Sequence, residues 1–198
     1  MLLVVLAGLV GAGKSTVGQA LAQLLHAPFV GEPVEEWLQS QALKEFYDTG
    51  NALPFQLMVL DTRIAAFRRI VGANSIVVCD RWLEEDYDIA HANYQLGKMT
   101  TAQFALYNEE FERKQNTFTD HTVLRIWLDV SPEACLQRIQ QRGRVEEQTI
   151  TLAYLESLLA HRTTPYDIVV ANAQDPNEVA RLVQSFIPAK YHPPSTPQ

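Results

Sequence analysis

A glycine-rich segment near the start of the chain restricts the fold more than any other feature. Residues 8–15 read GLVGAGKS, which fits the pattern G-x-x-x-x-G-K-[ST]. An apolar run precedes this segment, and a helical pattern over 14–26 follows it. In such a loop the glycines let backbone N–H groups turn toward phosphate oxygens, and the next helix adds the positive end of its dipole. The sequence therefore predicts a buried strand, a phosphate-binding loop and a helix, in that order.

The apolar residues 1–10 have a second possible interpretation, a secretory signal. No basic residue stands before them, and they run directly into the glycine-rich loop. The run is also too short to cross a bilayer. We therefore expect a first strand, no membrane partner and a cytoplasmic protein.

Further apolar runs alternate with helical patterns along the chain. The runs lie at 28–30, 75–79, 122–130 and 167–171, and the helical patterns cover 14–26, 51–72, 133–141 and the residues after 175. This alternation predicts an α/β fold, a doubly wound, five-stranded parallel sheet flanked by helices. A chain of 198 residues fits one domain, expected over 1–188, and the proline-rich tail 189–198 is expected to be disordered.

Charge and cysteine content restrict the partners and the compartment. The formal net charge of -7 argues against a nucleic-acid partner. The two cysteines, Cys79 and Cys135, lie in apolar runs, which fits a reducing compartment rather than a disulfide scaffold.

The phosphate loop predicts specific roles for its residues. Lys14 is expected to reach the β- and γ-phosphates, and the Ser15 hydroxyl to bind Mg²⁺. The loop alone does not separate a kinase from a GTPase or a motor ATPase. A switch GTPase would also carry Asp-x-x-Gly and Asn-Lys-x-Asp, and residues 172–175, NAQD, lack the lysine. The predicted ATP-binding residues of the loop are Gly8, Val10, Gly11, Ala12, Gly13, Lys14, Ser15 and Thr16.

Charged side chains follow two of the predicted strands. Glu32 comes after the second strand, where a carboxylate can accept the proton of an attacking hydroxyl. Asp80 and Arg81 end the third strand, where an acid can hold Mg²⁺ and an arginine can neutralise a transferred phosphoryl group. The alternatives are a helix-start acid for Glu32 and a surface ion pair for Asp80 and Arg81.

A polar pair interrupts the apolar face of the helix predicted over 51–72. Gln56 and Arg63 are seven residues apart, so they share one face at about 10 Å along the helix axis. Gln56 offers a donor and an acceptor to a base edge, and Arg63 offers a rigid fork. Asp86 is expected to pair with Arg63 and to accept from an exocyclic amine. A purely structural Arg63–Asp86 ion pair is the alternative.

Three arginines fall within a short stretch after the fourth strand. Arg138 and Arg142 are one helical turn apart, and Gly143 lets Arg144 turn in as well. Such a cluster suits a lid over a triphosphate, and a solvated run of charges is the alternative.

Together these motifs resemble the deoxynucleoside kinase family, its cytidine/guanosine/adenosine branch more than its thymidine branch. The resemblance covers residues 1–175 and rests on an ordered set of motifs. These are the phosphate loop, Glu32-Pro33-x-x-x-Trp37, Phe55-Gln56, Asp80-Arg81, Arg142-Gly143-Arg144-x-Glu146-Glu147 and Tyr154-Leu155.

The resemblance implies an ATP-dependent transfer of phosphate to a deoxynucleoside 5′-hydroxyl, with Mg²⁺ as the cofactor and a homodimer as the assembly. It implies Glu32 as the base, Arg81, Arg142 and Arg144 as catalytic cations, and Ser15 with Asp80 as the Mg²⁺ residues. Arg138 would bind ATP together with the lid arginines. The implied nucleoside-binding residues are Glu32, Trp37, Tyr47, Phe55, Gln56, Arg63, Arg81, Asp86 and Glu147.

The chain departs from the family pattern around the base. Trp82 stands where the family has serine, Ile89 or Ala90 replaces a stacking aromatic residue, and the stretch between Tyr47 and Gln56 is short. We expect deoxyadenosine, deoxyguanosine or deoxycytidine to be preferred over thymidine. The alternative functions are a nucleoside monophosphate kinase of the thymidylate kinase type and a non-catalytic nucleotide switch.

Overall fold

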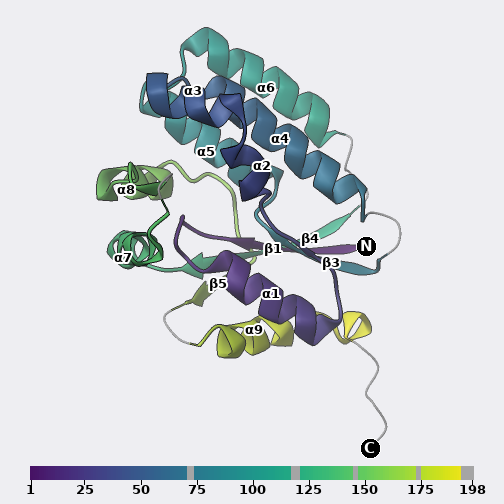
Figure 1. Ribbon diagram of the computed structural model, residues 1–198. Helices are drawn as coiled ribbons and strands as arrows, with labels where there is room; N and C mark the ends of the chain where they lie inside the picture. The colour runs from purple at the N-terminus through teal and green to yellow at the C-terminus, as the bar shows by residue number, and fades with distance from the viewer. Residues whose placement is uncertain (71–73, 117–120, 145–146, 173–174, 193–198) are drawn as a thin grey trace, which may run out of the picture.

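The computed structural model describes residues 1–70, 74–116, 121–144, 147–172 and 175–192. A parallel sheet of five strands forms its centre, in the order β2-β3-β1-β4-β5 (Figure 1). The strands are β1 (Leu2–Ala7), β2 (Phe29–Val30), β3 (Ile76–Asp80), β4 (Thr122–Asp129) and β5 (Ile168–Ala171). The helices are α1 (Lys14–Leu25), α2 (Val34–Leu38), α3 (Gln41–Thr49), α4 (Leu53–Arg68), α5 (Leu83–Gln95), α6 (Thr101–Gln115), α7 (Pro132–Arg142), α8 (Leu152–Ala160) and α9 (Pro176–Ser185).

The sheet confirms the predicted doubly wound parallel fold. β1 lies at its centre, and all six of its residues are buried. Strands covered on both faces in this way have nearly continuous apolar sequences, which is why the five apolar runs located them. β1 pairs with β3 on one side and with β4 on the other, so the strand order changes direction there. In open α/β sheets, ligands bind beyond the carboxyl ends of the strands at such a point.

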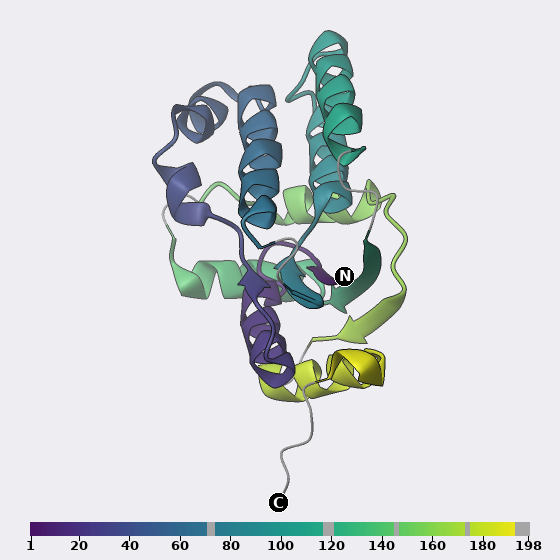
Figure 2. The same cartoon turned by 90° about the vertical axis from the view of Figure 1, so that its right-hand side faces the viewer.

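Helices cover both faces of the sheet and its carboxyl edge. α1 and α9 pack on one face, whereas α4, α5 and α6 pack on the other (Figures 1 and 2). α7 and α8 lie beside the carboxyl end of β1 (Figure 1). Ser131 caps α7, because its hydroxyl accepts from the Ala134 N–H, and Pro132 is the first residue of the helix.

Two expectations on the extent of the elements need correction. The helix predicted over 51–72 spans Leu53–Arg68, and residues 71–73 lie outside the described residues. The tail predicted to be disordered from residue 189 begins with a 3₁₀ turn over Ala189–Tyr191, and Tyr191 packs against the core beside α1 and α9. In the described ranges we find no helix that is long and apolar enough to cross a membrane.

Candidate active site

A cavity of about 1570 Å³ lies beyond the carboxyl ends of β1, β2 and β3. The phosphate loop, α2, α3, the start of α4, the end of α7 and the segment 147–154 form its walls. A cavity of this size exceeds the few hundred to about 1,000 Å³ of a typical single-ligand pocket. It therefore has room for two ligands side by side. Most predicted site residues line it, and only Gly8, Ala12 and Arg63 do not.

The phosphate loop has a backbone conformation that requires glycine at two positions. Gly11 and Gly13 have φ angles of 84° and 88°, in the left-handed region. A Cβ atom on Gly11 would lie 2.6 Å from the carbonyl oxygen of Cys135 on α7. A Cβ atom on Gly13 would lie 2.8 Å from the Nδ2 atom of Asn172. The loop is therefore fitted closely against α7 and the end of β5.

Lys14 opens α1 with its side chain buried at the loop. Its Nζ atom donates to the carbonyl oxygen of Leu9 at 3.0 Å. Burial first, and then the charge of Arg81, lower the pKa of Lys14 to about 8. The negative charge of a bound phosphate would stabilise the protonated form of Lys14.

We expect nucleotide binding to weaken as the pH rises above about 8, because Lys14 then loses its proton in the free protein. Phosphate binding favours the protonated lysine, so log Ka for ADP should fall by up to about one per pH unit. Titration calorimetry with ADP between about pH 7 and pH 9.5 measures this slope. The Lys14→Met variant lacks the titrating group and should bind weakly with no such slope. An ADP affinity of the native protein that is constant over this range would contradict the prediction.

Glu32 follows β2 and faces two arginines. Arg81 Nη1 donates to Glu32 Oε1 at 2.6 Å, and Arg63 Nη2 lies 3.6 Å from the same oxygen. Burial alone would raise the pKa of Glu32, but the charges of Arg81, Lys14 and Arg63 together lower it to about 2. Glu32 is therefore a carboxylate held for hydrogen bonding, not a solvated helix-start acid.

Arg81 has an unusual backbone conformation for a residue with a side chain. Its φ angle is 62°, in the left-handed region, although the residue is buried. Its Nη2 atom donates to the carbonyl oxygen of Gly8 at 3.3 Å. Arg81 thus joins Glu32 on the acceptor side to the phosphate loop on the donor side.

Trp82 begins α5 and packs into the core instead of the cavity. Its ring meets that of Phe67 at 4.6 Å between centroids. Trp82 is not among the cavity residues, whereas Ile89 is, and Ala90 is buried in the core. Of Trp82, Ile89 and Ala90, Ile89 is therefore the one that lines the cavity, as Gly50 and Phe55 of the short stretch after Tyr47 also do.

Ser15 and Asp80 form a pair that fits Mg²⁺. Ser15 Oγ donates to Asp80 Oδ2 at 2.5 Å. The buried Oδ1 atom of Asp80 has no hydrogen-bond partner among the described residues. Burial raises the pKa of Asp80, while Lys14 opposes the rise. A hydroxyl and a carboxylate with a spare oxygen suit a cation that takes few protein ligands and keeps waters and phosphate oxygens.

Aromatic rings form the wall of the cavity between α2 and α4. Trp37 Nε1 donates to Thr62 Oγ1 at 2.9 Å, which fixes the indole. Phe55 meets Trp37 edge to face at 5.9 Å and stacks with Phe46 at 5.9 Å. Tyr47 lines the cavity beside Phe46. The wall is aromatic and apolar, which suits a base-binding surface.

Arg63 and Asp86 form a buried, bidentate ion pair. Arg63 Nη2 donates to Asp86 Oδ1 at 2.9 Å, and Arg63 Nε donates to Asp86 Oδ2. Arg63 Nη1 donates to the carbonyl oxygen of Asp80 at 2.8 Å. Gln56 and Asp86 line the cavity, whereas Arg63 lies behind them. This corrects the expectation that Arg63 contacts the base edge, because its donors are used on Asp86 and the backbone.

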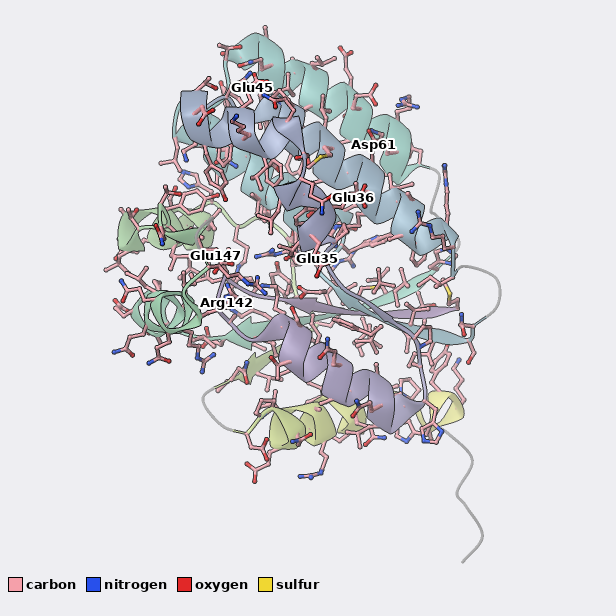
Figure 3. The ribbon with its side chains drawn as sticks, viewed as in Figure 1. Glu35, Glu36, Glu45, Asp61, Arg142 and Glu147 are labelled. Atoms are coloured by element: carbon pink, nitrogen blue, oxygen red, sulfur yellow. The ribbon has the colours of Figure 1, made fainter. Side chains whose placement is uncertain are left out.

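The arginine lid is held by Glu147. Arg142 Nη2 donates to Glu147 Oε1 at 2.5 Å, and Arg144 Nη1 lies 3.5 Å from the same oxygen. In Figure 3, Arg142 and Glu147 face each other on the α7–α8 side of the cavity, with Glu35 and Glu36 on the α2 side. The contact of Glu147 to a sugar 3′-hydroxyl stays a prediction, and Glu146 lies outside the described residues.

Three residues in the cavity or beside it were not predicted from the sequence. Lys98 follows α5, and its Nζ atom lies 4.8 Å from the Phe46 ring centre and 5.0 Å from that of Tyr154. Asn172 follows β5 and is hydrogen-bonded to the phosphate loop. Neither polar residue belongs to a local motif. Phe46, on α3, has no distinguishing pattern in the sequence around it. Only the folded chain brings them to the site.

Comparison with known proteins gives one consistent result. The family model described as "Deoxynucleoside kinase" matches residues 4–173. A deoxyadenosine kinase of Dictyostelium discoideum is 32% identical over 157 residues, which cover 78% of this chain and 62% of that protein. This chain thus spans less than two thirds of that relative's length. A deoxycytidine kinase of Homo sapiens is 30% identical over 195 residues, which cover 79% of this chain and 74% of that protein.

Solved structures show the same fold. The structure of a deoxyadenosine kinase from M. mycoides with bound dATP has a TM-score of 0.77 and 24% sequence identity. The match covers 92% of this chain and 97% of that one. The likeness confirms the predicted fold, a five-stranded parallel sheet flanked by helices.

Proposed function

Because this chain belongs to the deoxynucleoside kinase family, we propose that it transfers the γ-phosphate of ATP to the 5′-hydroxyl of a deoxynucleoside. One observation carries the proposal. Glu32 is a partly buried carboxylate, bound to Arg81, in a single cavity that also contains the phosphate loop and an aromatic wall. A hydroxyl group placed between the wall and the loop meets an acceptor for its proton and a cation for the transferred phosphoryl group.

The reaction divides between the two sides of the cavity. ATP lies on the phosphate loop, with Lys14, Arg138, Arg142 and Arg144 around its phosphates, and the nucleoside lies against Trp37 and Phe55. Positioning and charge neutralisation supply most of the catalysis, because the transition state of phosphoryl transfer is loose. Such a transition state needs no strong base, so Glu32, a weak base with a pKa of about 2, can accept the proton late. Bound Mg²⁺, held by Ser15 and Asp80, would neutralise charge on the phosphate oxygens.

A nucleoside monophosphate kinase is the nearest alternative. It would place a phosphate where Glu32 stands, and the lowered pKa keeps Glu32 charged at neutral pH, so the two anions would repel. Offering thymidine and thymidine monophosphate side by side separates the two activities. Phosphorylation of the monophosphate alone would contradict the proposal.

We expect deoxyadenosine, deoxyguanosine and deoxycytidine each to exceed thymidine in kcat/KM by about 5- to 150-fold. Both oxygens of Asp86 accept from Arg63, and an exocyclic amine can donate to a remaining lone pair. A thymine carbonyl offers no donor there and places its oxygen against the carboxylate, at a cost of about 1–3 kcal/mol. The resemblance to a deoxyadenosine kinase and a deoxycytidine kinase supports the same choice. Four deoxynucleosides, each assayed with ATP and Mg²⁺, provide the measurement. Thymidine as the best substrate would overturn the base assignment, and binding of ATP with no product from any nucleoside would favour the non-catalytic switch.

The other expectations stay predictions. Mg²⁺ as the cofactor is supported by the fit of Ser15 and Asp80 described above. The homodimer, the cytoplasmic location, the absence of a nucleic-acid partner and a single kinase domain over 1–188 rest on the resemblance and on composition.

A further inference from the structure

The carbonyl oxygen of Ala12, inside the phosphate loop, accepts hydrogen bonds from two distant side chains. Asn172, just after β5, donates to it from Nδ2 at 2.5 Å. Arg138 on α7 donates to it from Nη1 at 3.4 Å and reaches the carbonyl oxygen of Asn172 with Nη2 at 2.8 Å. Asn172 is only 4% exposed, and its N–H is anchored on the carbonyl oxygen of Asp129 at 3.0 Å.

These bonds set the direction of one peptide group. In a trans peptide the carbonyl and the following N–H point to opposite sides of the chain, and the described residues contain no cis peptide. The Ala12 carbonyl points at Asn172, so the Gly13 N–H points away from it. Gly13, Lys14 and Ser15 line the cavity wall at this position. The left-handed φ of 88° at Gly13 is part of the same arrangement, and a side chain there would collide with Asn172.

Asn172 and Arg138 differ in whether they can also contact a bound nucleotide. Arg138 lines the cavity, so a bound triphosphate competes with Ala12 for its guanidinium. Asn172 does not line the cavity and is buried, so its amide stays on the loop. It therefore holds the peptide whether or not Arg138 moves to the phosphates.

We propose that Asn172 is a positioning residue for the donor nucleotide: its carboxamide fixes the Ala12–Gly13 peptide so that the Gly13 N–H is ready for a phosphate oxygen. The inference rests on the phosphate loop of the proposed function, but not on which acceptor is phosphorylated. A preorganised N–H binds an anion without first having to reorient, which favours tight phosphate binding.

The test compares Asn172→Ala and Asn172→Leu with the same changes at Asn74. Asn74 is a matched control, because its Nδ2 atom donates to the carbonyl oxygen of Ile70 at 3.0 Å, on the C-terminal side of α4. Both Asn172 variants should bind ADP about tenfold more weakly, since each loses one donor to a buried carbonyl. Deoxynucleoside affinity and the melting temperature should match those of the Asn74 variants. The Gly13 amide resonance of the free protein should shift in the Asn172 variants alone.

The order of the two variants separates positioning from packing. The Leu variant keeps the size of Asn, adds no charge and cannot donate, so it should bind ADP no better than the Ala variant does. If Asn172 only filled space, the Leu variant would bind ADP better than the Ala variant. ADP affinity within threefold of the native value in the Ala variant, or equal losses for ADP and deoxynucleoside, would overturn the proposal. Calorimetry with ADP reports on the loop even if no deoxynucleoside is phosphorylated, so failure of the proposed function would be recognised separately.

Discussion

Replacing Glu32 with glutamine is expected to lower kcat by about 10²- to 10⁴-fold, the usual contribution of a general base. The amide cannot take the proton of the 5′-hydroxyl, but it keeps the size and hydrogen-bonding reach of the carboxylate. The KM for the deoxynucleoside should therefore change much less than kcat. Steady-state kinetics with saturating ATP measure both quantities.

Glu35→Gln is the matched control for this experiment. Glu35 lines the same cavity three residues further on, at the start of α2, and no ion pair or hydrogen bond links it to Arg81 within the described ranges. It undergoes the same loss of charge, so kcat should stay close to the native value. Turnover of the Glu32 variant close to that of the Glu35 variant would remove Glu32 from the base role. Since the pKa of Glu32 is about 2, this carboxylate should also add no ascending limb to the kcat profile near neutral pH.

The parts of the site that the sequence predicted are those attached to a strand end or a local motif. Glu32, Asp80 and Arg81 each follow a buried strand, so locating the apolar runs also located these side chains. The phosphate loop is recognised from the spacing of its own residues, so its prediction needed no knowledge of tertiary contacts.

The parts that the sequence did not predict depend on contacts between distant segments. Asn172 meets the phosphate loop across 160 positions of sequence. α5 went unpredicted because it buries acids, Glu85, Asp86 and Asp88, at positions where an amphipathic helix would have apolar residues. Arg63 was placed on the correct helix face and paired with Asp86 as expected, but the sequence could not show that Asp86 and backbone carbonyl oxygens together would keep Arg63 off the cavity wall.

The Arg63–Asp86 pair carries the second large prediction, a loss of stability. Replacing Asp86 with asparagine should lower the free energy of unfolding by about 3–5 kcal/mol, because it removes the bidentate partner of the buried Arg63 guanidinium and leaves only the more distant Glu32 as counter-charge. Both side chains are only 2% exposed, so water cannot replace the lost carboxylate. Urea denaturation, followed by circular dichroism, measures the change.

A double variant, Arg63→Met with Asp86→Leu, separates the structural role of the pair from its role at the base. It removes both charges and fills the space with apolar groups, so most of the lost stability should return. Asp86 lines the cavity, however, so the folded double variant should still bind deoxyadenosine and deoxycytidine poorly.

Glu110→Gln provides the control for stability, because it breaks the exposed ion pair between Glu110 and Arg113 and should leave unfolding unchanged. A stable Asp86→Asn variant would show that the buried pair contributes little to the fold. A double variant that is stable and retains normal nucleoside affinity would show that Asp86 does not contact the base. The expected preference for the other three deoxynucleosides over thymidine would then depend on another residue of the cavity wall.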